Sequence, residues 1–72
     1  MSEEPALDRL ARLARALHGD DGAVVLRGGD LPRAAVVNLR VPSAGKLAHG
    51  TDVADAIGRL NSVLAEPGEV AR

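Results

Sequence analysis

AVVLRGGDLPRAAVVNLRV, residues 23–41, is the stretch with the clearest strand pattern in this 72-residue chain. Residues 23–27 and 34–41 are rich in β-branched valine, and the glycine-rich segment between them is typical of a turn. In the second run Val37, Leu39 and Val41 alternate with polar residues, which is the two-residue period of a strand with one wet face. The stretch therefore predicts two antiparallel strands, over about 23–27 and 34–41.

A helix over the second half of this stretch is the competing interpretation. Asp30 is a suitable N-cap and Pro32 a suitable early helical residue, and such a helix would run to Arg40. Val36 and Val37 disfavour a helix only mildly, by losing side-chain freedom. The sequence favours a strand but leaves residues 31–40 open between the two.

The residues before this stretch predict an amphipathic helix over about 5–18. Pro5 suits the first helical position, where its missing N–H has no partner. Apolar residues recur at helical spacing on one face, namely Leu7, Leu10, Leu13, Ala14 and Leu17. The opposite face carries Arg9, Arg12 and Arg15, which we interpret as solvated. His18 and Gly19 are typical of a helix end.

After the stretch we expect a loop over 42–50, a second helix over about 52–66 and a flexible tail over 67–72. Thr51 or Asp52 can cap this helix, and Val53, Ile57, Leu60 and Leu64 form its apolar stripe. Beside the stripe, small residues at four-residue spacing would allow another backbone to approach closely. The two helices therefore predict packing or dimer contacts at Leu10, Leu17, Ala54, Ile57, Gly58 and Leu60.

The chain has no aromatic residue and no cysteine, so its core must be aliphatic. Domains below about 70 to 80 residues usually need disulfides, a metal or a partner subunit. A lone two-stranded hairpin is also marginal, because its outer edges stay unpaired. We therefore expect a single small α+β domain, 1–72, with a helix–β-hairpin–helix protomer that is completed by homodimerisation.

Composition narrows the class of protein further. Apolar residues make up 46% of the chain and charged residues 26%, which is ordinary for a globular domain. Neither a membrane-length apolar run nor a basic leader is found, so we expect a cytoplasmic protein without membrane contact. The excess of arginine over lysine and the abundance of alanine indicate a small bacterial protein.

Charge is distributed unevenly although the net charge is only -1. Residues 23–50 carry four basic residues against Asp30 alone, a net charge of +3, and the segments on either side are each at -2. We interpret the four basic residues as an interaction surface for an acidic partner, with a merely solubilising face as the alternative. The four are Arg27, Arg33, Arg40 and Lys46.

The sequence offers little support for catalysis. Gly45-Lys46 matches the end of a phosphate-binding loop, but Arg40 stands where the first glycine belongs and Leu47 where a hydroxyl belongs. His18 and His49 have no second ligand at metal spacing. We therefore expect no enzymatic activity, no catalytic residue, no metal and no cofactor; an anion site near Ser43 and Lys46 is the remaining alternative.

The first part of the chain resembles the start of small dimeric roadblock-type scaffold domains. The resemblance lies in a Leu-rich helix, the run Gly22-Ala23-Val24-Val25-Leu26 and the turn Gly29-Asp30-Leu31-Pro32. It covers less than half of the chain, and no residue role is carried over from it.

The sequence predicts a non-enzymatic protein–protein interaction module, a small dimeric adaptor or regulatory subunit that binds an unknown, acidic protein partner. One alternative is a nucleic-acid-binding regulator that uses arginine-rich surfaces, but the near-neutral charge makes nucleic acid an unfavoured partner. The other alternative is an anion-binding accessory subunit of an enzyme.

Overall fold

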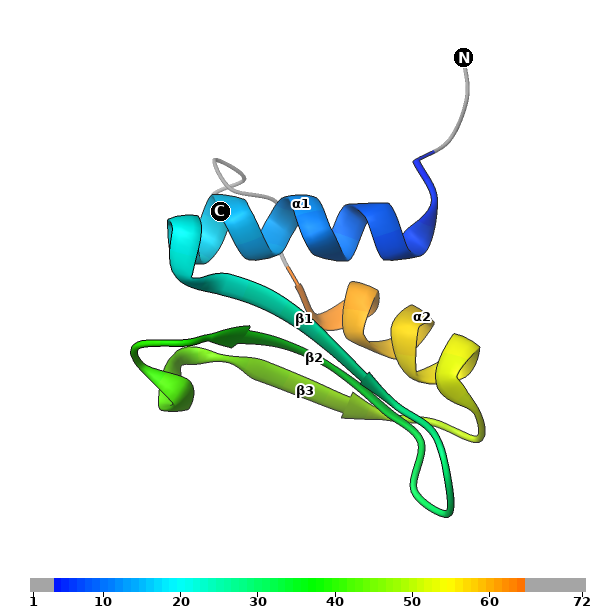
Figure 1. Cartoon of the computed structure of the whole chain (residues 1–72). Coiled ribbons are helices and arrows are strands. Elements are labelled where there is room, and N and C mark those ends of the chain that lie inside the picture. The colour runs from blue at the N-terminus through cyan, green and yellow to red at the C-terminus, as the bar shows by residue number, and fades with distance from the viewer. Residues whose placement is uncertain (1–3, 65–72) are drawn as a thin grey trace.

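Three antiparallel strands and two helices make up residues 4–64, the part of the chain that this computed structural model describes. The elements follow in the order α1 (Ala6–His18), η1 (Gly19–Asp21), β1 (Gly22–Arg27), β2 (Arg33–Asn38), η2 (Pro42–Ala44), β3 (Lys46–His49) and α2 (Val53–Val63), where η marks a 3₁₀ turn. The strands form one sheet in the order β1-β2-β3, and both helices cover the same side of it (Figure 1). The prediction of a small α+β fold is confirmed.

The third strand was missed by the sequence analysis, which expected a loop over 42–50. β3 is only four residues long, and its sequence Lys-Leu-Ala-His has no β-branched residue to indicate a strand. It pairs antiparallel with β2, with Ala34 opposite Ala48 and Ala35 opposite Leu47. Pairing with a neighbour, rather than the intrinsic preference of its own residues, decides this element.

β2 is a strand, so the helix considered for residues 31–40 is wrong. It ends at Asn38, three residues before the predicted end, because the Asn38 Oδ1 accepts hydrogen bonds from the N–H groups of Arg40 and Val41, both at 2.9 Å. Such a local bond turns the chain away from the sheet. Val36 is fully buried under the helices. The next residue, Val37, therefore lies on the opposite face of the sheet, so the predicted alternation that starts at Val37 does not mark the side that faces the helices.

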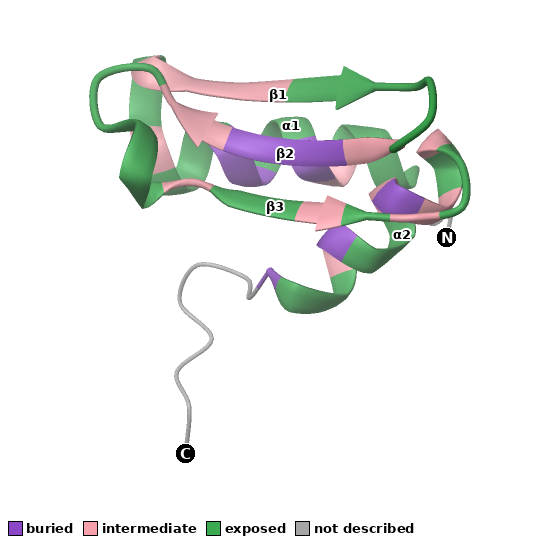
Figure 2. Cartoon of the chain, turned by 90° about the horizontal axis from the view of Figure 1, so that it is seen from below, coloured by how far each residue is buried: buried purple, intermediate pink, exposed green. Residues whose placement is uncertain are grey.

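The core lies between the sheet and the two helices. Its largest fully buried side chains are Leu10, Leu13, Leu60 and Val36. α1 packs against β1 and β2, and α2 packs against β2 and β3, so β2 is the most buried strand (Figure 2). Since a fully buried aliphatic side chain contributes about 1.5 to 3 kcal/mol, this small cluster is a modest source of stability.

The passage from α1 into β1 depends on two glycines. Gly19 ends the helix with a positive φ of 63°, and its N–H donates to the Arg15 carbonyl. Gly22 passes so close to α1 that a Cβ there would collide with the carbonyl oxygen of Ala14. A side chain at position 22 would therefore push α1 away from the sheet.

α2 begins with Asp52 as its N-cap, one of the two residues, Thr51 or Asp52, that the sequence offers for this role. The Asp52 Oδ1 accepts from the N–H of Asp55 at 2.7 Å. The helix covers Val53–Val63, and the remainder of the predicted helix beyond Leu64, with the predicted tail over 67–72, lies outside the described residues.

An arginine joins the two helices. The Arg9 Nη1 donates to the Asn61 Oδ1 at 2.7 Å and to the Asn61 carbonyl at 2.9 Å, and its Nη2 donates to the Leu64 carbonyl at 3.1 Å. These are carbonyls at the end of α2, which have no partner within the helix. The expectation that Arg9 lies on a solvated face is therefore wrong, because α2 supplies acceptors that the sequence of α1 does not reveal.

The residues predicted as helix or dimer contacts fall into two groups. Leu10 and Leu60 are fully buried and Ile57 packs against the core. The others are exposed in the single chain, namely Leu17, Ala54 and Gly58. A Cβ at Gly58 would meet nothing within 4 Å, so a contact of this residue with a second chain stays a prediction.

Candidate interaction surface

The side of the sheet that faces away from the helices is uncovered, and we call it the open face. Side chains alternate between the two faces of a strand, and Val24, Ala34, Val36 and Ala48 pack with the helices. The intervening residues of β1, β2 and β3 therefore form the open face (Figure 2). They are Ala23, Val25, Arg27, Arg33, Ala35, Val37, Leu47 and His49.

The middle of the open face is aliphatic. Val25 and Leu47 lie on either side of Ala35 in the strand register and are about half exposed, at 48% and 50%. Ala35 between them is only 7% exposed, although the core cluster does not include it. Its register partners Val25 and Leu47 flank it on the open face. The result is a small apolar patch that faces solvent.

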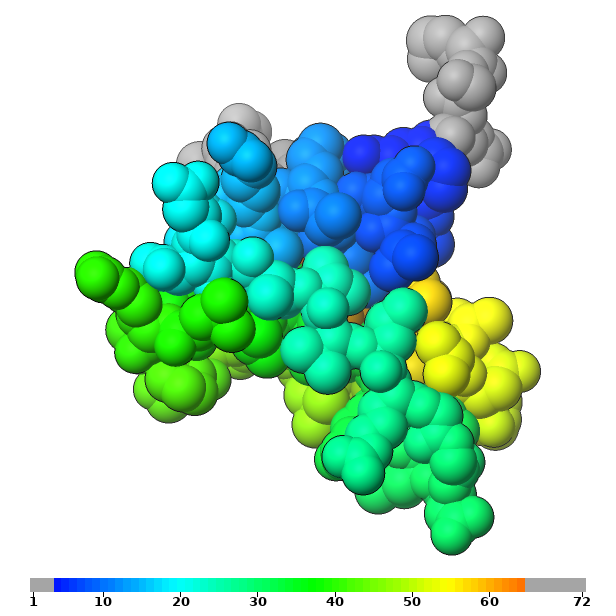
Figure 3. Space-filling view, viewed as in Figure 1, coloured from blue at the N-terminus to red at the C-terminus, as the bar shows by residue number. Residues whose placement is uncertain are grey.

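One end of the open face is basic. Arg27 pairs with Arg33 in the register of β1 and β2, and Arg33 pairs with His49 in that of β2 and β3. Like charges directly opposite each other, as Arg27 and Arg33 are, destabilise a sheet. None of the three side chains forms a hydrogen bond or ion pair within residues 4–64. This basic row lies beside the β1–β2 turn, which projects from the body of the molecule (Figure 3).

The opposite end of the open face carries an acidic group. The β1–β2 ladder continues through the Leu39 N–H, which donates to the Asp21 carbonyl at 2.8 Å. The Asp21 carboxylate lies 3.8 Å from the Arg40 Nε, and the Arg40 side chain is 81% exposed. Exposed pairs at this distance contribute little, so the Asp21 carboxylate remains open to another partner. The open face thus has a basic row at one end and the exposed Asp21–Arg40 pair at the other.

The predicted interaction residues are divided between three places. Arg27 and Arg33 come together in the basic row. Arg40 lies at the opposite end beside Asp21. Lys46 is opposite Val36 in the register, so it belongs to the covered face. His49 and the aliphatic patch were not predicted from the sequence, because neither can be assigned to the open face until β3 is recognised as a strand.

Lys46 contributes to an open groove between the ends of the helices and the sheet. The groove has a volume of about 350 Å³. His18 in its wall is 3.2 Å from the Asn38 side-chain nitrogen. Its lining residues are Leu17, His18, Val36, Ala44, Lys46, Val63 and Leu64. Ser43, which the sequence paired with Lys46 as an anion site, is not among the lining residues.

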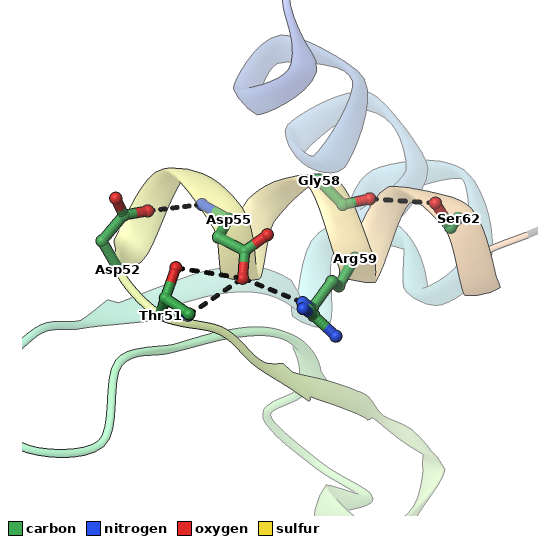
Figure 4. Close-up of polar contacts among 6 residues, drawn as sticks. All are labelled: Thr51, Asp52, Asp55, Gly58, Arg59 and Ser62. Atoms are coloured by element: carbon green, nitrogen blue, oxygen red, sulfur yellow. Dashed lines mark hydrogen bonds and ion pairs between the residues drawn. The ribbon is translucent and has the colours of Figure 1, made fainter.

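A network of polar contacts holds the start of α2 (Figure 4). The Asp55 Oδ2 accepts from the Thr51 N–H and from the Arg59 Nε, both at 2.9 Å. The Thr51 hydrogen bond, followed by the Arg59 contact, holds the pKa of the Asp55 carboxyl below its usual value. At the other end of the helix the Ser62 hydroxyl donates to the Gly58 carbonyl at 3.1 Å. These contacts cap the start of α2 and pair Asp55 with Arg59.

The described residues contain no cluster of three or more groups that could hold a metal ion. Within the same part of the chain, neither His18 nor His49 forms a hydrogen bond with a serine or a carboxylate. The open face, with its apolar patch and basic row, is therefore the surface that we consider for function.

No protein-family model matches the chain, and no curated protein or solved structure is significantly similar to it. No helix within residues 4–64 is long and apolar enough to cross a membrane.

Proposed function

We propose that the chain is a non-enzymatic protein-interaction module, a small dimeric adaptor or regulatory subunit that binds through the open face. The observation that carries this proposal is the combination of half-exposed Val25 and Leu47 with the adjoining basic row. Contiguous apolar side chains beside charged ones are typical of binding surfaces.

The basic row supports a partner with acidic groups. Arg27 and Arg33 repel each other in the free chain, and a carboxylate placed between them would remove that repulsion. Such a contact would steer the encounter and weaken as salt screens it.

The contacts of the helix arginines argue against the nucleic-acid alternative. Arg9 is bonded to the end of α2, and the Arg12 Nε donates to the Glu4 carboxylate at 2.8 Å. Only Arg15, loosely paired with Asp20 at 3.9 Å, remains available for a phosphate on this helix. A phosphate site along α1 is therefore poorly supported. The basic row is also accessible to phosphates, but it adjoins the exposed Val25 and Leu47, which favour a protein partner.

Cysteine reporters test the proposal, because the natural chain contains none. The variant Leu47→Cys reports on the open face, and Ala11→Cys reports on an exposed position of α1. Each is treated with a maleimide in dilute purified form, at high protein concentration and in an extract of the producing cells. We expect protection of Leu47→Cys at high concentration or in the extract, while Ala11→Cys reacts equally in all three.

Arg27→Gln combined with Arg33→Gln should reduce that protection, whereas Arg15→Gln should leave it unchanged. Equal reactivity of Leu47→Cys under all three conditions would show that nothing binds the open face, and would overturn the proposal.

A further inference from the structure

The open face is arranged so that it fits a copy of itself. On both β1 and β2, one alanine and one valine lie at equal distances from the register pair Val24–Val36. A two-fold axis that crosses the strands at this pair would place each alanine opposite a valine of the other copy. Small and large side chains then interdigitate, as packed layers require. The residues are Ala23 and Val25 on β1, and Ala35 and Val37 on β2.

The charges at the two ends of the open face fit the same axis. Asp21 is the last residue of η1 and continues the β1–β2 ladder through the Leu39 hydrogen bond, and Arg27 is the last residue of β1. Each is three residues from Val24 along the chain. The axis therefore brings Asp21 of one copy, with Arg40 beside it, to Arg27 of the other, twice. Arg27 then competes with Arg40 for the Asp21 carboxylate, because the Asp21–Arg40 pair is exposed and 3.8 Å long. An axis along the strands would instead stack the two basic rows and place Arg33 against Arg33. Such a like-charge contact is strongly unfavourable in an interface.

We infer that a second copy of this chain docks on the open face, with its strands antiparallel to those of the first. The contact brings Asp21 of each copy to Arg27 of the other, around a centre of alanine and valine. This inference rests on the proposed function and names the partner.

The size of the open face sets the strength of this contact. Each of the two longer strands has six residues. With about 3.3 Å per residue and about 4.8 Å between strands, the three strands present a flat area of roughly 280 Å². Stable interfaces bury about 800 Å² on each partner. The dimer is therefore a weak one, with a mass that rises from 7.4 kDa toward twice that value between about 1 µM and 1 mM.

Cross-linking of single-cysteine variants locates the contact. Packed sheets are about 10 Å apart, so a bis-maleimide of that span should link Val25→Cys to itself and also Leu47→Cys to itself. A dimer joined through the outer edges of β1 would leave the two Leu47 positions roughly 24 Å apart. A dimer joined through the outer edges of β3 would leave the two Val25 positions roughly 24 Å apart. Linking of both variants therefore supports the face contact. Linking of only one overturns it in favour of an edge.

Charge exchange tests the orientation. Asp21→Lys and Arg27→Glu should each weaken the dimer about tenfold, since each creates two repulsive pairs. The double variant D21K/R27E restores both attractions and should dimerise about as well as the natural chain. Circular dichroism of dilute samples shows that each variant is folded. A double variant as weak as the single ones overturns the antiparallel arrangement.

The two proposals fail separately. A chain that stays at 7.4 kDa up to about 1 mM overturns the second copy as the partner. If Leu47→Cys is then still protected in the cell extract, the open face binds another protein and the proposed function stands.

Discussion

The covered face and the open face of the sheet are built from alternate residues of the same strands, yet they meet different surroundings. On β2, Ala34 and Val36 are fully buried beneath the helices, whereas Val37 is partly exposed on the other side. The covered face excludes charge except at Lys46, on its rim, and the open face ends in a basic row. Burial on one side serves folding, and the exposed apolar patch on the other is available for binding.

The largest expected effect comes from moving one charge between these faces. Val36→Asp places an unpaired carboxylate in the core, and we expect a loss of more than about 4 kcal/mol, enough to unfold the chain. Val37→Asp, one residue later, should cost less than about 1 kcal/mol in dilute solution. Thermal unfolding followed by circular dichroism measures both. Similar losses would contradict the assignment of the two faces.

Gly22 and Gly58 test the same contrast between packed and open surroundings. Gly22→Ala forces a Cβ against the Ala14 carbonyl, and we expect it to cost about 1 to 3 kcal/mol. Gly58→Ala enters open space in α2 and should stabilise the dilute chain by up to about 1 kcal/mol through helix propensity. Urea unfolding gives both values. A destabilising Gly58→Ala would indicate that a second chain packs at this position.

The sequence revealed the elements better than the surfaces they form. The helical period was sufficient to predict both helices, and the valine runs were sufficient to predict β1 and β2, whereas the cap of α2 was left open between Thr51 and Asp52. Val36 and Val37 are both valine, so the pattern could not tell which one faces the helices, and a shift of one residue exchanges the faces. Arg27 and Arg33 belonged to the predicted surface, but their pairing with His49 depends on β3, which carries no sequence signal of its own.

The contact between α1 and α2 above the covered face should depend on Arg9. Arg9→Gln removes the hydrogen bonds to the Asn61 and Leu64 carbonyls, and we expect a loss of about 1 to 2 kcal/mol. The matched change Arg15→Gln, at an exposed pair 3.9 Å long, should cost less than about 0.5 kcal/mol. Equal effects in thermal unfolding would show that Arg9 does not join the helices in solution.

The smallest effect concerns the rim of the covered face, where α2 follows β3. The hydrogen bond from Thr51 and the contact with Arg59 hold the pKa of Asp55 below its usual value. The unfolded chain therefore binds a proton at Asp55 more readily than the folded chain. The resulting stabilisation is complete above the unfolded pKa, near 4, and is lost as the pH falls through the lower folded pKa.

Asp55→Asn removes this carboxylate and therefore this part of the pH dependence. We expect the melting temperature of the natural chain to fall more between neutral and strongly acidic pH than that of the variant, by a small margin because Asp55 lies at the surface. Asp30→Asn in the exposed β1–β2 turn is the control, since the Asp30 side chain forms no hydrogen bond within residues 4–64. If Asp55→Asn and Asp30→Asn follow the same pH profile as the natural chain, the Thr51–Asp55–Arg59 contacts do not stabilise α2 through the charge of Asp55.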